Sequence, residues 1–154
     1  MKERDWRQEI RDHIESVRII ERCRVETLGH FEQFCEFIAE PAAEDLAGEL
    51  AEHRIRAGHR KIKDREFAFS LCFPGTKDEQ FRYRVILPAN SVELKLDLVV
   101  ETRRTRRADF VSKTETFMPG LKTEEILKLD KSEILLDLLD RYTSFIYETM
   151  TTPD

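Results

Sequence analysis

The stretch that decides the fold is EFAFSLCFPG, residues 66–75. Before it, apolar residues recur three and four positions apart, as they do along one face of a helix. Within it they alternate instead, so that Phe67, Phe69 and Leu71 are expected on one side of an extended chain. The change of period predicts that helix gives way to strand near residue 65.

Three further alternating stretches follow. Residues 81–87 come after the turn PGTKDEQ, residues 92–100 come after PANS, and residues 109–118 form a threonine-rich stretch that alternates less regularly. Short connections between successive strands are typical of antiparallel pairing. Residues 64–118 are therefore expected to form a four-stranded antiparallel β-meander.

The residues before this sheet carry two helical patterns. The first extends from Trp6 to Ile38 and is expected to be one long, bent helix or two successive helices. The second begins at Pro41, and Gly58 is its expected C-terminal cap. Because proline disfavours a helical residue before it, Glu40 and Pro41 mark an expected reversal. Residues 1–58 are thus predicted to form a helical hairpin.

The last part of the chain, residues 122–150, has the wide apolar face of a C-terminal helix packed on the sheet, with a capping-box start at Asp130 and Glu133. A run of helices, then strands, then helix indicates the α+β class. A length of 154 residues is that of one domain, so residues 1–154 are expected to form a single α+β domain.

The composition is 40% hydrophobic and 37% charged, which argues against both disorder and a membrane span. Residues 1–20 are charged from the second position, which argues against a secretory signal peptide. Cys23, Cys35 and Cys72 form no closely spaced pair, as expected of reduced thiols in the cytoplasm. Neither a cofactor nor a membrane partner is expected.

Positive charge is concentrated in residues 54–65 and in residues 103–107, although the formal net charge of the chain is −5. Residues 103–107 contain no glycine or asparagine, so they predict a long, projecting basic hairpin between two strands. With the polar face of the second strand they would form a basic surface, whose predicted members are Arg60, Lys61, Lys63, Arg82, Arg84, Arg103, Arg104, Arg106 and Arg107.

Three interpretations of this basic surface remain open. It could be solvated and paired with the acidic helices of the same chain, or it could contact a protein partner. It could also follow a phosphate backbone, although a sequence pI of about 5.5 and the lack of any nucleic-acid-binding motif argue against that role.

A metal site is a further hypothesis. Glu26 and His30 are four residues apart, as are Glu49 and His53, and a reversal at Pro41 would bring the two pairs to similar heights in the hairpin. No phosphate-binding glycine loop and no nucleophile motif accompany them. Enzymatic activity is therefore uncertain and less favoured than a binding role.

The expected function is that of a non-catalytic binding or adaptor module, acting through protein–protein contacts and forming a homodimer. The long first helical region supports self-association, because its length of about 50 Å would exceed the width of the sheet that it covers. The alternatives are a nucleic-acid-binding protein that uses the basic hairpin and the basic segment, and, third, a metal-dependent enzyme.

Overall fold

The computed structural model describes residues 3–153. Its helical elements are α1 (Trp6–Phe34), η1 (Cys35–Ala39), α2 (Glu40–Ala51), α3 (Thr123–Ile126) and α4 (Lys131–Thr151). Its strands are β1 (Ala57–Ile62), β2 (Glu66–Cys72), β3 (Glu79–Ile86), β4 (Asp97–Thr102) and β5 (Val111–Thr116). A long N-terminal helix, an antiparallel sheet and a C-terminal helix confirm the α+β class.

The sheet has five strands, in the order β1-β2-β3-β4-β5, so the prediction of four strands was wrong. The additional strand, β1, pairs with β2 from Ala57 opposite Leu71 to Ile62 opposite Glu66. Gly58 therefore lies in a strand and does not cap a helix. Most of β1 is exposed at the edge of the sheet, so its sequence lacks the apolar alternation that marks a half-buried strand.

Residues 92–96 also differ from the prediction, because they form a loop and only Asp97–Thr102 forms the strand β4. The alternation was produced by Leu94 and Leu96, which are buried without belonging to a strand. The Leu94 amide donates to Thr123 Oγ1 at 3.1 Å, and the Leu96 carbonyl accepts from the Phe117 amide at 2.9 Å. Loop residues that pack beneath the next element can thus reproduce a strand pattern.

The predicted helical hairpin was wrong, because the chain does not reverse at Glu40 and Pro41. Both Ala39 and Glu40 keep helical dihedral angles, and the helix continues from α1 through η1 into α2. In the π-helical segment η1 the Glu40 amide donates to the Cys35 carbonyl, a wider turn than that of an α-helix. Pro41 lacks an amide hydrogen, and this local widening lets the helix pass it without a break.

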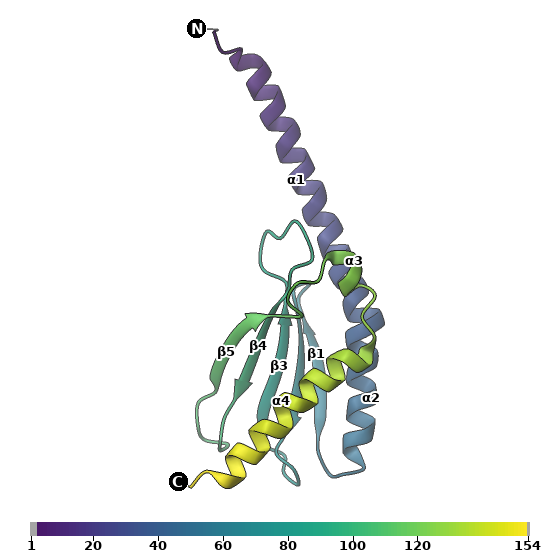
Figure 1. Ribbon diagram of the computed structural model, residues 1–154, viewed down its shortest axis with the longest axis vertical. Coiled ribbons are helices and arrows are strands. Elements are labelled where there is room, and N and C mark those ends of the chain that lie inside the picture. The colour runs from purple at the N-terminus through teal and green to yellow at the C-terminus, as the bar shows by residue number, and fades with distance from the viewer. Residues whose placement is uncertain (1–2, 154) are drawn as a thin grey trace.

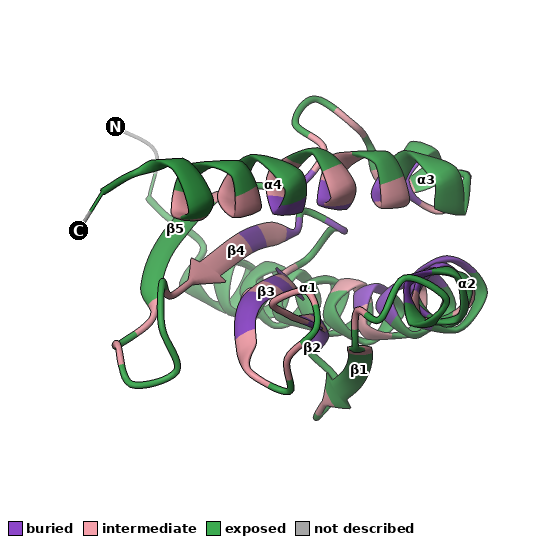
Figure 2. Cartoon of the chain, turned by 90° about the horizontal axis from the view of Figure 1, so that it is seen from below, coloured by how far each residue is buried: buried purple, intermediate pink, exposed green. Residues whose placement is uncertain are grey.

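The helices cover one face of the sheet. In Figure 2, α4 lies above the curved sheet and α1 and α2 lie beside it, while no helix of residues 3–153 covers the opposite face, here called the open face. Between these layers lies the hydrophobic core, which includes Phe31, Phe34, Phe67, Phe69 and Tyr83, each no more than 2% exposed. The expectation of a C-terminal helix on the sheet is confirmed.

The N-terminal part of α1 projects beyond the sheet (Figure 1). Thr27 is the first buried residue of this helix, and residues 6–26 are here called the arm helix. The Asp5 side chain caps the arm helix by accepting from the Gln8 amide at 3.2 Å, and Arg4 pairs with Glu9 at 2.8 Å. Within residues 3–153, no helix is long and apolar enough to cross a membrane.

Candidate interaction surfaces

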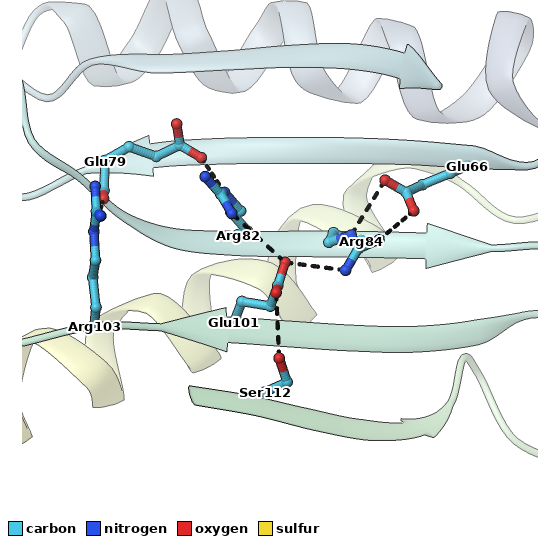
Figure 3. Close-up of polar contacts among 7 residues, drawn as sticks. All are labelled: Glu66, Glu79, Arg82, Arg84, Glu101, Arg103 and Ser112. Carbon is cyan, nitrogen blue, oxygen red and sulfur yellow. Dashed lines mark hydrogen bonds and ion pairs between the residues drawn. The ribbon is translucent and has the colours of Figure 1, made fainter. Parts of the chain in front are cut away.

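Arg82 and Arg84 project from β3 onto the open face, where glutamates bind them (Figure 3). Arg84 Nη2 lies 2.6 Å from Glu66 Oε1, and Arg84 Nη1 lies 3.1 Å from Glu101 Oε1. Arg82 Nε donates to Glu79 Oε1 at 2.5 Å. The antiparallel register creates these contacts, because Arg84 lies beside β2 on one side and beside β4 on the other.

This network is electrically balanced. The hydrogen bond from Arg84 to Glu66 raises the pKa of the guanidinium, against the opposing effect of burial, so Arg84 remains a cation. In Figure 3 the carboxylates of Glu66, Glu79 and Glu101 pair with Arg82 and Arg84, and Arg103 donates to the backbone carbonyl of Glu79. The middle of the open face therefore presents no excess of positive charge.

The arginine-rich segment 103–107 lies in the loop between β4 and β5, and its first two arginines contact the body of the protein. Arg103 Nε donates to the Glu79 carbonyl at 2.8 Å, and Arg104 Nη2 donates to the Thr152 carbonyl at 2.9 Å. The guanidinium groups of Arg82 and Arg103 lie 4.0 and 4.4 Å from the ring centroid of Phe110. These contacts satisfy donors that a projecting ribbon would leave to solvent.

Arg104, Arg106 and Arg107 are exposed, whereas Arg103 is half-buried. Arg106 Nε lies 4.0 Å from Asp78 Oδ1, at the limit of an ion pair. The other basic segment lies at the opposite edge of the sheet: Arg60 and Lys61 are on β1, and Lys63 is in the turn that leads to β2. Lys61 Nζ is 3.8 Å from Glu32 Oε1. The strands β2 and β3 therefore separate Arg60, Lys61 and Lys63 from the loop between β4 and β5.

The candidate metal ligands are also far apart. Glu26 precedes Glu49 by 23 residues of continuous helix, about 35 Å, and His53 lies beyond the end of α2. His53 Nε2 lies 3.7 Å from Glu49 Oε1 in an exposed pair. Among residues 3–153, no group of three or more histidine, cysteine, aspartate or glutamate side chains is arranged to hold a metal ion.

Cys35 and Cys72 are not activated thiols. Burial raises the pKa of Cys35 to about 12 and also raises the pKa of Cys72. A nucleophilic cysteine needs the opposite shift, because the thiolate is the reactive form. Both thiols are therefore protonated at neutral pH.

A different surface lies along the arm helix, where a stripe of large apolar side chains meets solvent. Their exposed fractions are 57% for Trp6, 50% for Ile10, 46% for Ile14, 38% for Val17 and 42% for Ile20. Isolated exposed apolar residues are ordinary, but a contiguous stripe of this kind marks an interaction site. The predicted basic surface included none of these residues.

The stripe follows a seven-residue repeat along α1. Residues at positions 10, 17, 24 and 31 repeat every seven residues, and a second series runs through positions 6, 13, 20, 27 and 34. Such paired series form the seam of a left-handed coiled coil. At Phe31 and Phe34 the seam is fully buried in the core of the chain, whereas along the arm helix no other element of the described residues 3–153 covers it.

The chain matches no family model, no curated protein and no solved structure.

Proposed function

We propose that this protein is a non-catalytic binding module that self-associates through the apolar stripe of its arm helix. The observation that carries the proposal is the exposure of Trp6, Ile10, Ile14, Val17 and Ile20 along one side of a helix that is attached to the body at only one end. A second copy would cover the stripe with an identical stripe, as in an isologous interface.

The energy available is adequate for a reversible dimer. Because these side chains are already partly covered, complete burial of each one contributes about 1 kcal/mol. Ten such side chains from two copies would contribute about 10 kcal/mol, which is comparable with the cost of about 4–15 kcal/mol for association. We therefore expect a dimer whose population depends on protein concentration.

Other features favour binding over the alternative roles. The charge balance of the open face weakens the case for a phosphate-following surface, which needs unneutralised cations.

The three cysteines are free thiols, which supports a reducing compartment such as the cytoplasm.

Light scattering over a range of protein concentrations tests the proposal. The wild-type mass should rise from 18.3 kDa towards twice that value. The double variant Ile10→Lys/Val17→Lys should remain monomeric, because it places two charges within the stripe. Circular dichroism should show that this variant keeps its helix and sheet content.

The matched control is Val25→Lys, which alters an apolar residue of the arm helix that is 69% exposed and lies outside the stripe. This control should self-associate like the wild type. A wild-type protein that stays monomeric at several hundred micromolar would overturn the proposal, and so would a Val25→Lys variant as impaired as the double variant.

A further inference from the structure

We infer that two arm helices pair in antiparallel orientation about a twofold axis level with residue 15, where the Ile14 side chains that flank the seam in the two copies lie side by side. This inference rests on the proposed self-association and adds its geometry. Three independent features of the arm helix lead to it: the composition of the seam, the charges that flank the seam, and the length of helix that is free.

The seam residues complement one another in the antiparallel alignment. Ile10 would lie opposite Ile20 of the second copy, and Val17 would lie opposite His13. Trp6 would lie opposite Arg24 of the second copy, a pairing in which a guanidinium can stack on the indole ring. The same ring already holds a guanidinium in the single chain, where Arg7 lies 4.4 Å from the Trp6 ring centroid.

The charges that flank the seam are also complementary. Arg7 would lie opposite Glu21 of the second copy, and twofold symmetry would make this contact twice, once on each side of the Ile14 pair. Both residues are exposed and are fourteen positions apart on their own helix, so they cannot pair within one chain. Opposite charges at such flanking positions set the orientation of paired helices.

A parallel alignment would bring like residues together. Arg24 would face Arg24 of the second copy across the seam, and His13 would face His13. Two guanidinium groups in close contact repel each other, and partial burial in the seam strengthens that repulsion. The single arginine of the seam therefore acts against a parallel dimer, whereas the antiparallel alignment places it against an aromatic ring.

The length of the arm helix favours this register over its neighbours. Trp6 of the second copy would reach the level of Arg24, three residues short of Thr27, where α1 becomes buried. A shift of seven residues towards the body would place Trp6 opposite Phe31, which is fully buried. A shift in the other direction would leave Ile20 opposite Glu3 and uncovered by any apolar residue.

Charge reversal tests the orientation. Arg7→Glu or Glu21→Arg alone should raise the dissociation constant of the dimer about tenfold, because each variant converts two attractive contacts into two repulsive ones. The double variant Arg7→Glu/Glu21→Arg should return the constant to within about threefold of the wild type. An equimolar mixture of the two single variants should also recover, through heterodimers in which both contacts are attractive.

A parallel dimer would show neither recovery, because residues 7 and 21 would be far apart in it. Single variants without effect, or a double variant no better than the single ones, would overturn the antiparallel geometry even if the wild type dimerises. A monomeric wild type would instead overturn the proposed self-association together with this inference.

Distances between nitroxide labels provide a second readout that does not depend on affinity. Gln8, Glu15 and Arg22 lie on the outer side of the arm helix and would carry the labels one at a time, in a chain whose native cysteines are replaced. In the antiparallel dimer the labels at residue 15 would be level, and those at residues 8 and 22 would be offset by about 21 Å along the axis. Equal distances at all three positions would indicate a parallel dimer and overturn the inference.

Discussion

The Tyr83 hydroxyl donates a 2.6 Å hydrogen bond to Asp137 Oδ2 and so joins the central strand β3 to the helix α4. The same carboxylate oxygen accepts from Arg141 Nε at 3.1 Å, and Arg141 also pairs with Glu115 on β5. Burial, and then the hydrogen bond to Asp137, raise the pKa of Tyr83, so its hydroxyl remains a neutral donor. This relay fixes α4 over the middle and one edge of the sheet.

Tyr83→Phe should lower the free energy of unfolding by about 1–3 kcal/mol, because it removes the donor and leaves the buried side of the carboxylate less well satisfied. Urea denaturation followed by circular dichroism measures the change. Tyr147→Phe is the matched control, since Tyr147 is 72% exposed and its substitution should change stability by less than about 0.5 kcal/mol. Equal effects of the two substitutions would contradict the role of the relay.

Stability should fall at alkaline pH. Burial raises the pKa of Cys35 from 9.0 to about 12 and that of Tyr142 from 10.0 to about 12. The folded state therefore holds both protons at pH values where the unfolded chain has released them. The stabilisation is complete below about pH 9 and is lost as the pH rises towards about 12.

Within this window each group should lower the free energy of unfolding by about 1.4 kcal/mol per pH unit. Urea denaturation at a series of pH values should show a plateau below pH 9 and then a decline. Cys35→Ala should reduce the decline that begins near pH 9, to which Cys72 also contributes, and Tyr142→Phe should remove part of the decline above pH 10. A decline of unchanged slope in both variants would contradict this assignment.

The sequence predicted those parts of the fold whose residues alternate between core and solvent. The large apolar side chains of β2 and β3 alternate along each strand, so their pattern was visible, whereas β1 is largely exposed and shows no such pattern. Leu94 and Leu96 produced a strand pattern from a loop. Pro41 suggested a reversal, because a proline usually ends the helix before it. The helix continues past Pro41 because the preceding turn widens, and local sequence does not specify that widening.

The site was less predictable than the fold. Arg84 is neutralised by Glu66 and Glu101, and these contacts depend on strand register, which a single sequence does not reveal. The seven-residue spacing of the arm helix is present in the sequence. However, Ile10 and Phe31 belong to the same series, and only the structure distinguishes the exposed member from the buried one.

Replacing either of two glycines in the long helix by alanine should stabilise the protein. Gly29 and Gly48 are helical and exposed, and a Cβ atom at either position would meet no atom within 4 Å. Gly29→Ala and Gly48→Ala should each raise the free energy of unfolding by about 0.5–1 kcal/mol, since alanine restricts the unfolded chain and favours helix. Differential scanning calorimetry measures the gain. Gly75→Ala should have the opposite effect, because Gly75 has a φ of +77°.

The arginines of segment 103–107 should separate into structural and dispensable members. Arg103 donates to the Glu79 carbonyl at 2.8 Å and stacks on Phe110, so Arg103→Ala removes both a hydrogen bond and a cation–π contact. The expected loss is about 1–2 kcal/mol in the free energy of unfolding. Arg107→Ala makes the same chemical change at an exposed position and should cost less than about 0.5 kcal/mol.

Urea denaturation of both variants, with amide hydrogen exchange of residues 102–110, measures the difference. Faster exchange in Arg103→Ala alone would locate the loss in the loop, because that arginine links the loop to the start of β3. If Arg107→Ala proved as destabilising as Arg103→Ala, the loop would depend on its charge as a whole and not on the contacts of Arg103. The stability of the loop would then have to be assigned to the positive charges of all its arginines.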